Sequence, residues 1–162
     1  MISSRPLLFP GPETGWEIHG KGSAGGRVKR RLESPRDAGK GMIFAVPSSH
    51  CRTIVVTLPT GDESLFQDMI RSQLEKRGMS GEKGPPLFDY QVLHRSDRET
   101  RVSVDILAAD LPADFRLPGA RSYVSAARAL AVPDHKLVLW REHGNLVLSA
   151  GSGGQTAFSS IV

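Results

Sequence analysis

The segment CRTIVVTLPTGDESLFQDMIRSQLEKRG, residues 51–78, constrains the fold more than any other part of the chain. In its first half apolar and polar side chains alternate, so that Ile54, Val56 and Leu58 fall on one face. This period of two predicts a β-strand with one face toward a core, and Pro59 ends it.

The second half of the segment has the pattern of an amphipathic helix. Thr60 and Glu63 fit a capping box, in which two side chains satisfy backbone N–H groups of the first turn. Gly78 suits the C-terminal cap because glycine readily adopts a positive φ. The apolar stripe, on a helix of about four turns, consists of Leu65, Phe66, Met69, Ile70 and Leu74. The segment therefore predicts a strand and a helix that covers its sheet.

The rest of the chain is predicted to consist mostly of strands. Those expected before the segment cover residues 5–11, 15–20, 27–33 and 42–47. Those expected after it cover residues 87–95 and 100–111, followed by a hairpin over 136–150. A second helix is predicted over residues 120–132, with Tyr123, Ala127 and Leu130 on one stripe, and a short apolar end over 156–162. The order β-β-(β)-β-β-α-β-β-α-β-β predicts an α/β or α+β fold, a mixed sheet with helices packed on it.

Length and composition set the broad class. The 162 residues suffice for one domain, 1–162, and 39% hydrophobic with 23% charged residues is typical of a soluble globular protein. No run approaches the length of a membrane span, and the N-terminus is a poor signal peptide. The single cysteine excludes a disulfide framework, so a bacterial-type cytoplasm is the default location.

The positive charge is concentrated in one glycine-rich stretch, residues 20–41. Between residues 21 and 40 there are seven Lys and Arg against Glu33 and Asp37, a local excess larger than the net charge of +4. The remainder is thus about neutral. Such a stretch is typical of a solvated loop, with an anion-binding or membrane-surface patch as the alternative.

Two glycine patterns resemble phosphate-binding loops. GKGSAG, residues 20–25, matches G-x-G-x-x-G through Gly20, Gly22 and Gly25, with Lys21 inside it. No convincing helix follows, as nucleotide binding would require, so a hairpin loop is the preferred interpretation. GSGGQT, residues 151–156, is interpreted as a mobile turn near the end of the chain.

The histidines and the cysteine do not form a recognisable site. None of the spacings among them matches a helical or zinc-finger ligand pair, so we expect no metal ligand set. His50 and Cys51 are adjacent on a predicted strand and should point to opposite faces, which opposes a nucleophile–base pair. The five histidines are His19, His50, His94, His135 and His143.

A pair of aspartates offers one more chemical alternative. Asp89 and Asp105 lie on neighbouring predicted strands, where two carboxylates could bind Mg²⁺ in an RNase H-like sheet. No third acidic residue occupies a matching strand position, and Asp110 is better interpreted as a turn residue. A metal-dependent nuclease is therefore the weaker hypothesis.

The order of motifs over residues 42–133 resembles the actin-like proteins of type IV pilus and type II secretion platforms, the PilM-like and GspL-like cytoplasmic families. In that pattern a strand ending in proline leads to a strand that closes with Leu-Pro, then a helix, a hD-Y-x-V strand and an alternating apolar strand. The matching residues here are Ala45-Val46-Pro47, Leu58-Pro59, Ile70 with Glu75, Asp89-Tyr90-Gln91-Val92 and residues 102–109. The resemblance implies an actin-like or RNase H-like subdomain.

The chain departs from the nucleotide-binding members of that group. Residues 5–22 lack the aspartate of the first phosphate loop, and LWREHGNLVL, residues 139–148, lacks the D-x-G of the second. The resemblance thus implies a subdomain without a nucleotide site, with no cofactor, as in GspL-like proteins. It also implies that the chain is the N-terminal part of a longer protein with a membrane helix further on.

The function implied by the resemblance is a non-enzymatic scaffold. It would lie in the cytoplasm at the inner-membrane face and dock an assembly ATPase and the cytoplasmic tail of an inner-membrane assembly protein, with a homodimer left open. The polar side of the first helix supplies the candidate contacts Arg71, Gln73 and Arg77, for which simple solvation is the alternative. The competing functions are an actin-like ATPase with GKGSAGG as a degenerate phosphate loop, and a nucleic-acid binder using residues 21–40.

Overall fold

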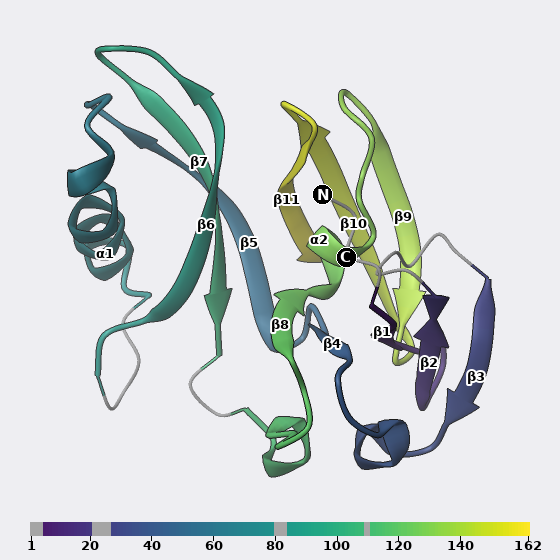
Figure 1. Ribbon diagram of the computed structural model, residues 1–162. Helices are drawn as coiled ribbons and strands as arrows, with labels where there is room; N and C mark the ends of the chain where they lie inside the picture. The colour runs from purple at the N-terminus through teal and green to yellow at the C-terminus, as the bar shows by residue number, and fades with distance from the viewer. Residues whose placement is uncertain (1–4, 21–26, 80–83, 109–110) are drawn as a thin grey trace.

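The computed structural model describes residues 5–20, 27–79, 84–108 and 111–162, and within these the fold is a mixed α/β arrangement of two sheets with few helices (Figure 1). The first sheet has the order β3-β2-β1-β4-β8. Its strands are β1 (Leu7–Pro10), β2 (Trp16–His19), β3 (Val28–Leu32), β4 (Ile43–Val46) and β8 (Ser122–Ser125).

This first sheet combines an antiparallel meander with two parallel strands. β1, β2 and β3 run antiparallel in turn, whereas β4 pairs in parallel with both β1 and β8. Phe44, Ala45 and Val46 of β4 are buried, which agrees with the continuous apolar run of residues 42–47. Such runs are typical of strands covered on both faces.

The second sheet consists of two three-stranded antiparallel units. Its order is β6-β7-β5-β11-β10-β9, but β5 and β11 are registered at a single pair, Thr53 and Ser159. The turn before β11 lies beside β6, because a Cβ added to Gly153 would come within 2.6 Å of the Leu93 carbonyl oxygen. The strands are β5 (Cys51–Leu58), β6 (Leu87–Arg95), β7 (Thr100–Leu107), β9 (Leu137–Glu142), β10 (Asn145–Ser152) and β11 (Gln155–Ile161).

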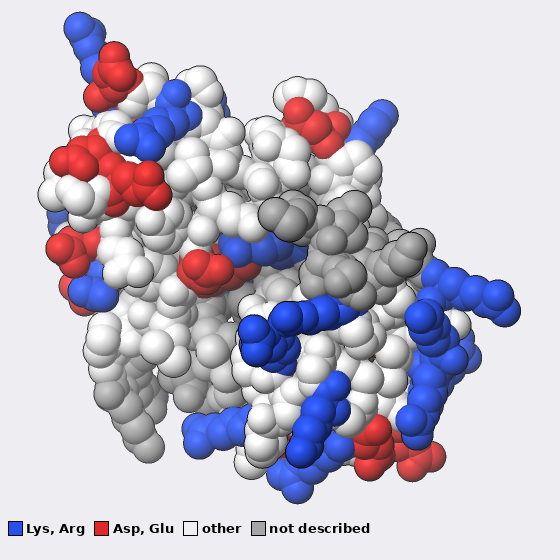
Figure 2. All heavy atoms as spheres, in the orientation of Figure 1, with Lys and Arg blue, Asp and Glu red and all other residues white. Residues whose placement is uncertain are grey.

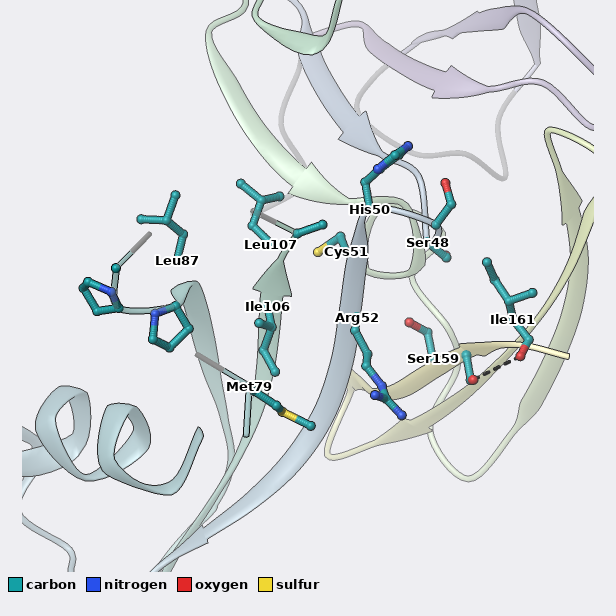
Figure 3. Close-up of a pocket in the computed structure, with 16 residues that line it drawn as sticks. Ser48, His50, Cys51, Arg52, Met79, Leu87, Ile106, Leu107, Ser159 and Ile161 are labelled. Atoms are coloured by element: carbon teal, nitrogen blue, oxygen red, sulfur yellow. Dashed lines mark hydrogen bonds between the residues drawn. The ribbon is translucent and has the colours of Figure 1, made fainter. Parts of the chain in front are cut away.

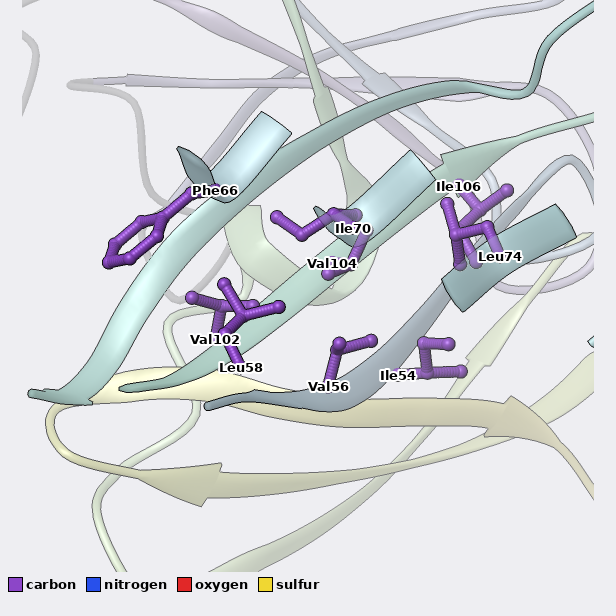
Figure 4. Close-up of a cluster of buried hydrophobic side chains, with 9 residues drawn as sticks. All are labelled: Ile54, Val56, Leu58, Phe66, Ile70, Leu74, Val102, Val104 and Ile106. Atoms are coloured by element: carbon purple, nitrogen blue, oxygen red, sulfur yellow. The ribbon is translucent and has the colours of Figure 1, made fainter. Parts of the chain in front are cut away.

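The helix α1 (Phe66–Lys76) covers one face of the β5–β7–β6 unit. Figure 4 shows how Phe66, Ile70 and Leu74 lie over the apolar side chains of β5 and β7. All three are fully buried and four residues apart, so the predicted stripe is confirmed for them. Leu65 precedes the α-helix and is exposed.

The start of this helix differs from the prediction, and its end agrees with it. A short 3₁₀ helix (Glu63–Leu65) comes first, and Asp62 caps it by accepting a hydrogen bond from the Ser64 N–H at 3.0 Å. The predicted capping box is therefore wrong. At the other end, Gly78 has φ 68° and the Met79 N–H donates to the Leu74 carbonyl, a Schellman motif that allows the chain to leave the helix.

The second predicted helix is largely wrong. Residues 122–125 form β8, and the helix α2 (Ala126–Ala129) is only four residues long. The competing interaction is the parallel pairing of Tyr123 and Val124 with β4, which outweighs the helix propensity of the alanines. The stripe of Tyr123, Ala127 and Leu130 does not exist, because Tyr123 lies on a strand and is half exposed.

The C-terminal third contains one more strand pairing than predicted. The hairpin at 136–150 is confirmed as β9 and β10, with positive φ at His143 and Gly144 in its two-residue turn. Gly153 and Gly154 form a second such turn, which leads into β11. The apolar end at 156–162 is thus an inner strand of the second sheet. Two loops also contain 3₁₀ turns, Pro35–Ala38 and Ala113–Phe115.

Among the described residues, none of the helices has the length and apolar character needed to cross a membrane. The core lies in three clusters, one under α1, one around Trp16 and Phe44, and one around Phe9 and α2.

Candidate functional site

An open groove of about 830 Å³ lies where the two sheets and the end of α1 meet (Figure 3). Apolar side chains come from β7, from the start of β6, from the residue after the Schellman turn and from the end of β11. Arg52 of β5 supplies a positive charge at its wall. The large apolar side chains that line the groove are Met79, Leu87, Ile106, Leu107 and Ile161.

This groove has the shape of a docking surface. Leu87 is 67% exposed at the start of an edge strand, and Ile161 is also exposed. Exposed apolar side chains gathered beside a concave surface are typical of binding sites for peptides or small apolar groups.

Cys51 lies in the wall of the groove but is a poor nucleophile. Burial raises the pKa of its thiol to about 12, with Asp105 adding to the effect. At neutral pH the sulfur therefore stays protonated, whereas nucleophilic cysteines need a lowered pKa. Cys51 packs in the cluster around Trp16 and Phe44.

His50 is not positioned to act on Cys51. Its ring packs edge-to-face on Phe115, with the ring centroids 5.2 Å apart. Figure 3 shows His50 and Cys51 pointing in different directions, as predicted from their adjacent positions. The two residues do not form a nucleophile and a base.

The aspartates considered as a metal site are brought together, but an arginine bridges them. Asp89 and Asp105 are directly opposite each other on β6 and β7. Arg128 of α2 reaches both, at 3.1 Å from Asp89 and 2.8 Å from Asp105. Thr53 donates a further hydrogen bond to Asp105 at 2.6 Å. The guanidinium thus supplies the positive charge that two facing carboxylates need.

The arginine bridge is largely withdrawn from water. The side chains of Arg128 and Asp105 are 14% and 8% exposed, whereas Asp89 is on the surface. Burial raises the pKa of Asp105, and the charge of Arg128 and the Thr53 hydrogen bond oppose the rise. In the described part of the chain, no group of three or more His, Cys, Asp or Glu side chains is placed to hold a metal ion.

A second buried carboxylate ties β9 to the turn after β4. Glu142 is fully buried and accepts hydrogen bonds from the Ser48 backbone N–H and from Trp140 Nε1, the latter at 3.2 Å. Burial raises the pKa of Glu142, while these donors lower it in part. Glu142 is therefore a structural carboxylate that fixes the β9 end against the first sheet.

The predicted partner contacts do not form one surface. Arg71 pairs with Asp68 at 3.4 Å, and Arg77 is exposed at the end of the helix. Gln73 donates its side-chain amide to the Thr57 carbonyl at 2.8 Å, so it anchors α1 to β5. Gln73 and Arg77, four residues apart, share a side of the helix, whereas Arg71 lies about 200° around it from Gln73.

The basic glycine-rich stretch, residues 20–41, contains the strand β3 and the 3₁₀ turn Pro35–Ala38. Lys21, Gly22 and Gly25 fall outside the described residues, and Gly20 follows β2. From Val28 the chain is a strand, β3, which is not the helix that a dinucleotide loop requires. A Cβ on Gly20 would approach the flexible side chain of Lys29 at 2.7 Å.

Cations do gather on that side of the molecule. Figure 2 shows Lys and Arg side chains clustered where β2 and β3 lie, and mixed charges around α1. Lys29, Arg30 and Arg31 are all exposed on β3, and Arg31 pairs with Glu17 at 3.2 Å.

Sequence reasoning overlooked Arg128 and Glu142. Arg128 is a lone charge in an alanine-rich run, and such a residue, if buried, needs a charged partner. Glu142 follows Val138 and Trp140 in the alternation of β9, so it shares their inward face. Both patterns indicated a buried charged side chain, but neither identified the residues that the side chain contacts.

No protein-family model and no curated protein matches the chain.

Proposed function

We propose that this chain is a non-enzymatic scaffold domain of a type IV pilus or type II secretion-like assembly platform. It has an actin-like, RNase H-like first sheet, and it acts at the cytoplasmic face of the inner membrane. Its partners are the assembly ATPase and the cytoplasmic tail of an inner-membrane assembly protein.

The strand order of the first sheet is the observation that carries this proposal. An antiparallel meander, β1 to β3, is followed by two strands parallel to β1, in the order β3-β2-β1-β4-β8. RNase H-like and actin-like domains have this order. It adds to the motif order at residues 42–133, which implied the same group.

The groove and the neighbouring edge of β6 provide the means of docking. β6 pairs with β7 alone among the described strands, so its other edge can accept an extended peptide by main-chain hydrogen bonds. Leu87, Met79 and Ile161 would receive apolar side chains of the tail. Affinity would come from the backbone and specificity from these pockets.

Calorimetric titration tests the proposal with two probes. One is a synthetic peptide of the cytoplasmic tail of the inner-membrane assembly protein from the same genome, and the other is the purified assembly ATPase. We expect saturable binding of the peptide, weakened at least tenfold by Leu87→Asp. Leu65→Asp is the matched control, because Leu65 is an exposed leucine outside the groove.

Three results would overturn the proposal. The first is that neither probe binds at 100 μM, a concentration about a hundredfold above a micromolar Kd. The second is that Leu87→Asp and Leu65→Asp have equal effects, which would place the binding site outside the groove. The third is that Mg-ATP stabilises the chain by about 2.7 kcal/mol at a hundredfold excess over its Kd, which would support the ATPase alternative.

A further inference from the structure

The three strands β9, β10 and β11 present an apolar face that no described element covers. Their registers align three cross-strand rows: Leu137 with Ala150 and Phe158, Leu139 with Leu148 and Ser160, and Arg141 with Leu146. Leu137 is 71% exposed and Leu139 57%. We call this the outer face, and its apolar members are Leu137, Leu139, Leu146, Leu148, Ala150 and Phe158.

The other face of the same strands is buried. Val147, Ser149, Ala157 and Ser159 point inward and are almost inaccessible. A three-stranded sheet with polar outer positions would be ordinary, because antiparallel sheets commonly expose one polar face. Here the alternation is broken, since leucine occupies outer positions on both β9 and β10.

The outer face lies on the same side of the second sheet as α1. Thr53 and Ser159 are opposite each other at the junction of the two units, so their side chains point the same way. Ile54 and Phe158, one residue along, therefore share the opposite side. Ile54 packs under α1. Thus α1 covers this side of β5–β7–β6, and nothing described covers the same side of β11–β10–β9.

The groove connects the helix to the uncovered face. Met79, just beyond α1, and Ser160 and Ile161 of β11 line the same cavity. A ligand bound to the outer face would therefore be separated from α1 by this groove.

The dimensions of the outer face fit one short helix. Three strands about 4.8 Å apart and six residues long give a surface of roughly 14 by 20 Å, on the order of 300 Å². A stable dimer needs about 800 Å² from each partner, so a second copy on this face alone is too small an interface. An α-helix about 10–12 Å wide and about 13 residues long matches it. α1, with 11 residues, already covers the neighbouring unit.

The cations that border this face are Arg141 and Arg52. Arg141 ends the third row and forms an ion pair with Glu13, whereas Arg52 points to the same side from β5 at the groove. None of the strand residues in the three rows is acidic. A helix whose flanking residues toward Arg52 are acidic is therefore complementary to this face.

We propose that the outer face of β9–β11 binds an amphipathic helix of a partner protein, with an apolar stripe of three turns and acidic flanks. The inference does not depend on the proposed function, because it rests on a second surface and on a helical ligand. Leucines at i, i+3/i+4 and i+7 of the partner would lie on the leucines of β9 and β10.

Fluorescence anisotropy with three synthetic 14-residue peptides tests the proposal. The first has leucines at helical spacing and glutamates elsewhere. The second has the same composition in scrambled order, and the third replaces glutamate by lysine. We expect saturable micromolar binding of the first peptide and at least tenfold weaker binding of the other two. Leu139→Glu should weaken binding of the first peptide at least tenfold, whereas the control Leu65→Glu should leave it unchanged.

Circular dichroism first establishes that both variants are folded, which their exposed positions favour. The proposal is overturned if the first peptide shows no saturable binding up to 1 mM, if the three peptides bind equally, or if Leu139→Glu has no effect. It is also overturned if sedimentation shows a dimer that Leu139→Glu dissociates, since the face would then bind a second copy. Loss of tail binding in Leu87→Asp, with peptide binding here intact, separates this face from the groove.

Discussion

Replacing Arg128 by methionine removes the cation that lies against buried Asp105 and keeps a flexible, unbranched side chain. In the native protein the guanidinium is 2.8 Å from Asp105 and 3.1 Å from Asp89. Once it is gone, Asp105 retains the hydroxyl of Thr53 as a donor at 2.6 Å. A buried carboxylate then faces the interior without a counter-charge.

The expected cost follows from this burial. Removing one partner of a buried ion pair costs about 3–5 kcal/mol. We expect Arg128→Met to lie at the lower end of this range, about 3 kcal/mol at pH 7. The hydrogen bond from Thr53 remains, and the carboxyl group of Asp105, whose pKa burial already raises, can take up a proton. Asp105→Asn combined with Arg128→Met should lose less than the sum of the two, because no buried charge is left.

Urea unfolding followed by the fluorescence of Trp16 and Trp140 measures these differences. With a urea dependence of about 2 kcal/mol/M, the midpoint of Arg128→Met should fall by about 1.5 M. Arg71→Ala is the control. It removes an exposed ion pair with Asp68 and should change the free energy of unfolding by less than about 0.5 kcal/mol. A cost below about 1 kcal/mol for Arg128→Met, or purely additive effects in the double mutant, would refute the reasoning.

Three further predictions concern stability. Ile70→Ala opens a cavity under α1 at a fully buried site and should cost about 3 kcal/mol in urea unfolding, and a cost under 1 kcal/mol would contradict the packing. Gly78→Ala should cost only about 1 kcal/mol, because φ is positive but nothing lies within 4 Å of the new Cβ. Gly151→Ala should cost more, because its Cβ would meet the Pro133 carbonyl at 2.1 Å, and the reverse order would be inconsistent with this. Burial raises the pKa of Glu142 above its ordinary 4.5, so the folded state binds this proton more tightly and stability falls as pH rises from about 4.5 through the folded pKa. Glu142→Gln should flatten that fall between pH 4 and 8, and equal slopes would disprove the assignment.

The sequence was most informative where the local pattern and the tertiary contacts favour the same secondary structure. The strand and helix of residues 51–78 follow from alternation and from four-residue spacing, and both lie in one cluster under α1. The hairpin at residues 136–150 follows from its His143-Gly144 turn. These features depend on neighbours in sequence, which is why pattern reasoning can find them.

The errors lie where distant pairing decides. Tyr123 and Val124 lie in a run that suits a helix, but they pair with β4, about 80 residues earlier, and form a strand. Ser159 belongs to a short terminal run whose partner is Thr53. The candidate site depends on the same kind of contact, because the groove draws on four segments that no local pattern brings together.

The single residue pair that joins β5 to β11 divides the second sheet into two units for amide hydrogen exchange. Opening at that junction breaks one pair, whereas opening inside either unit breaks a ladder of eight pairs between β5 and β7 or six between β9 and β10. Amides of β7 and β10, each central in its own unit, therefore exchange only when that unit unfolds. A ligand held by the outer face alone slows exchange in β9–β11 and leaves the rates of the β5–β7–β6 unit unchanged.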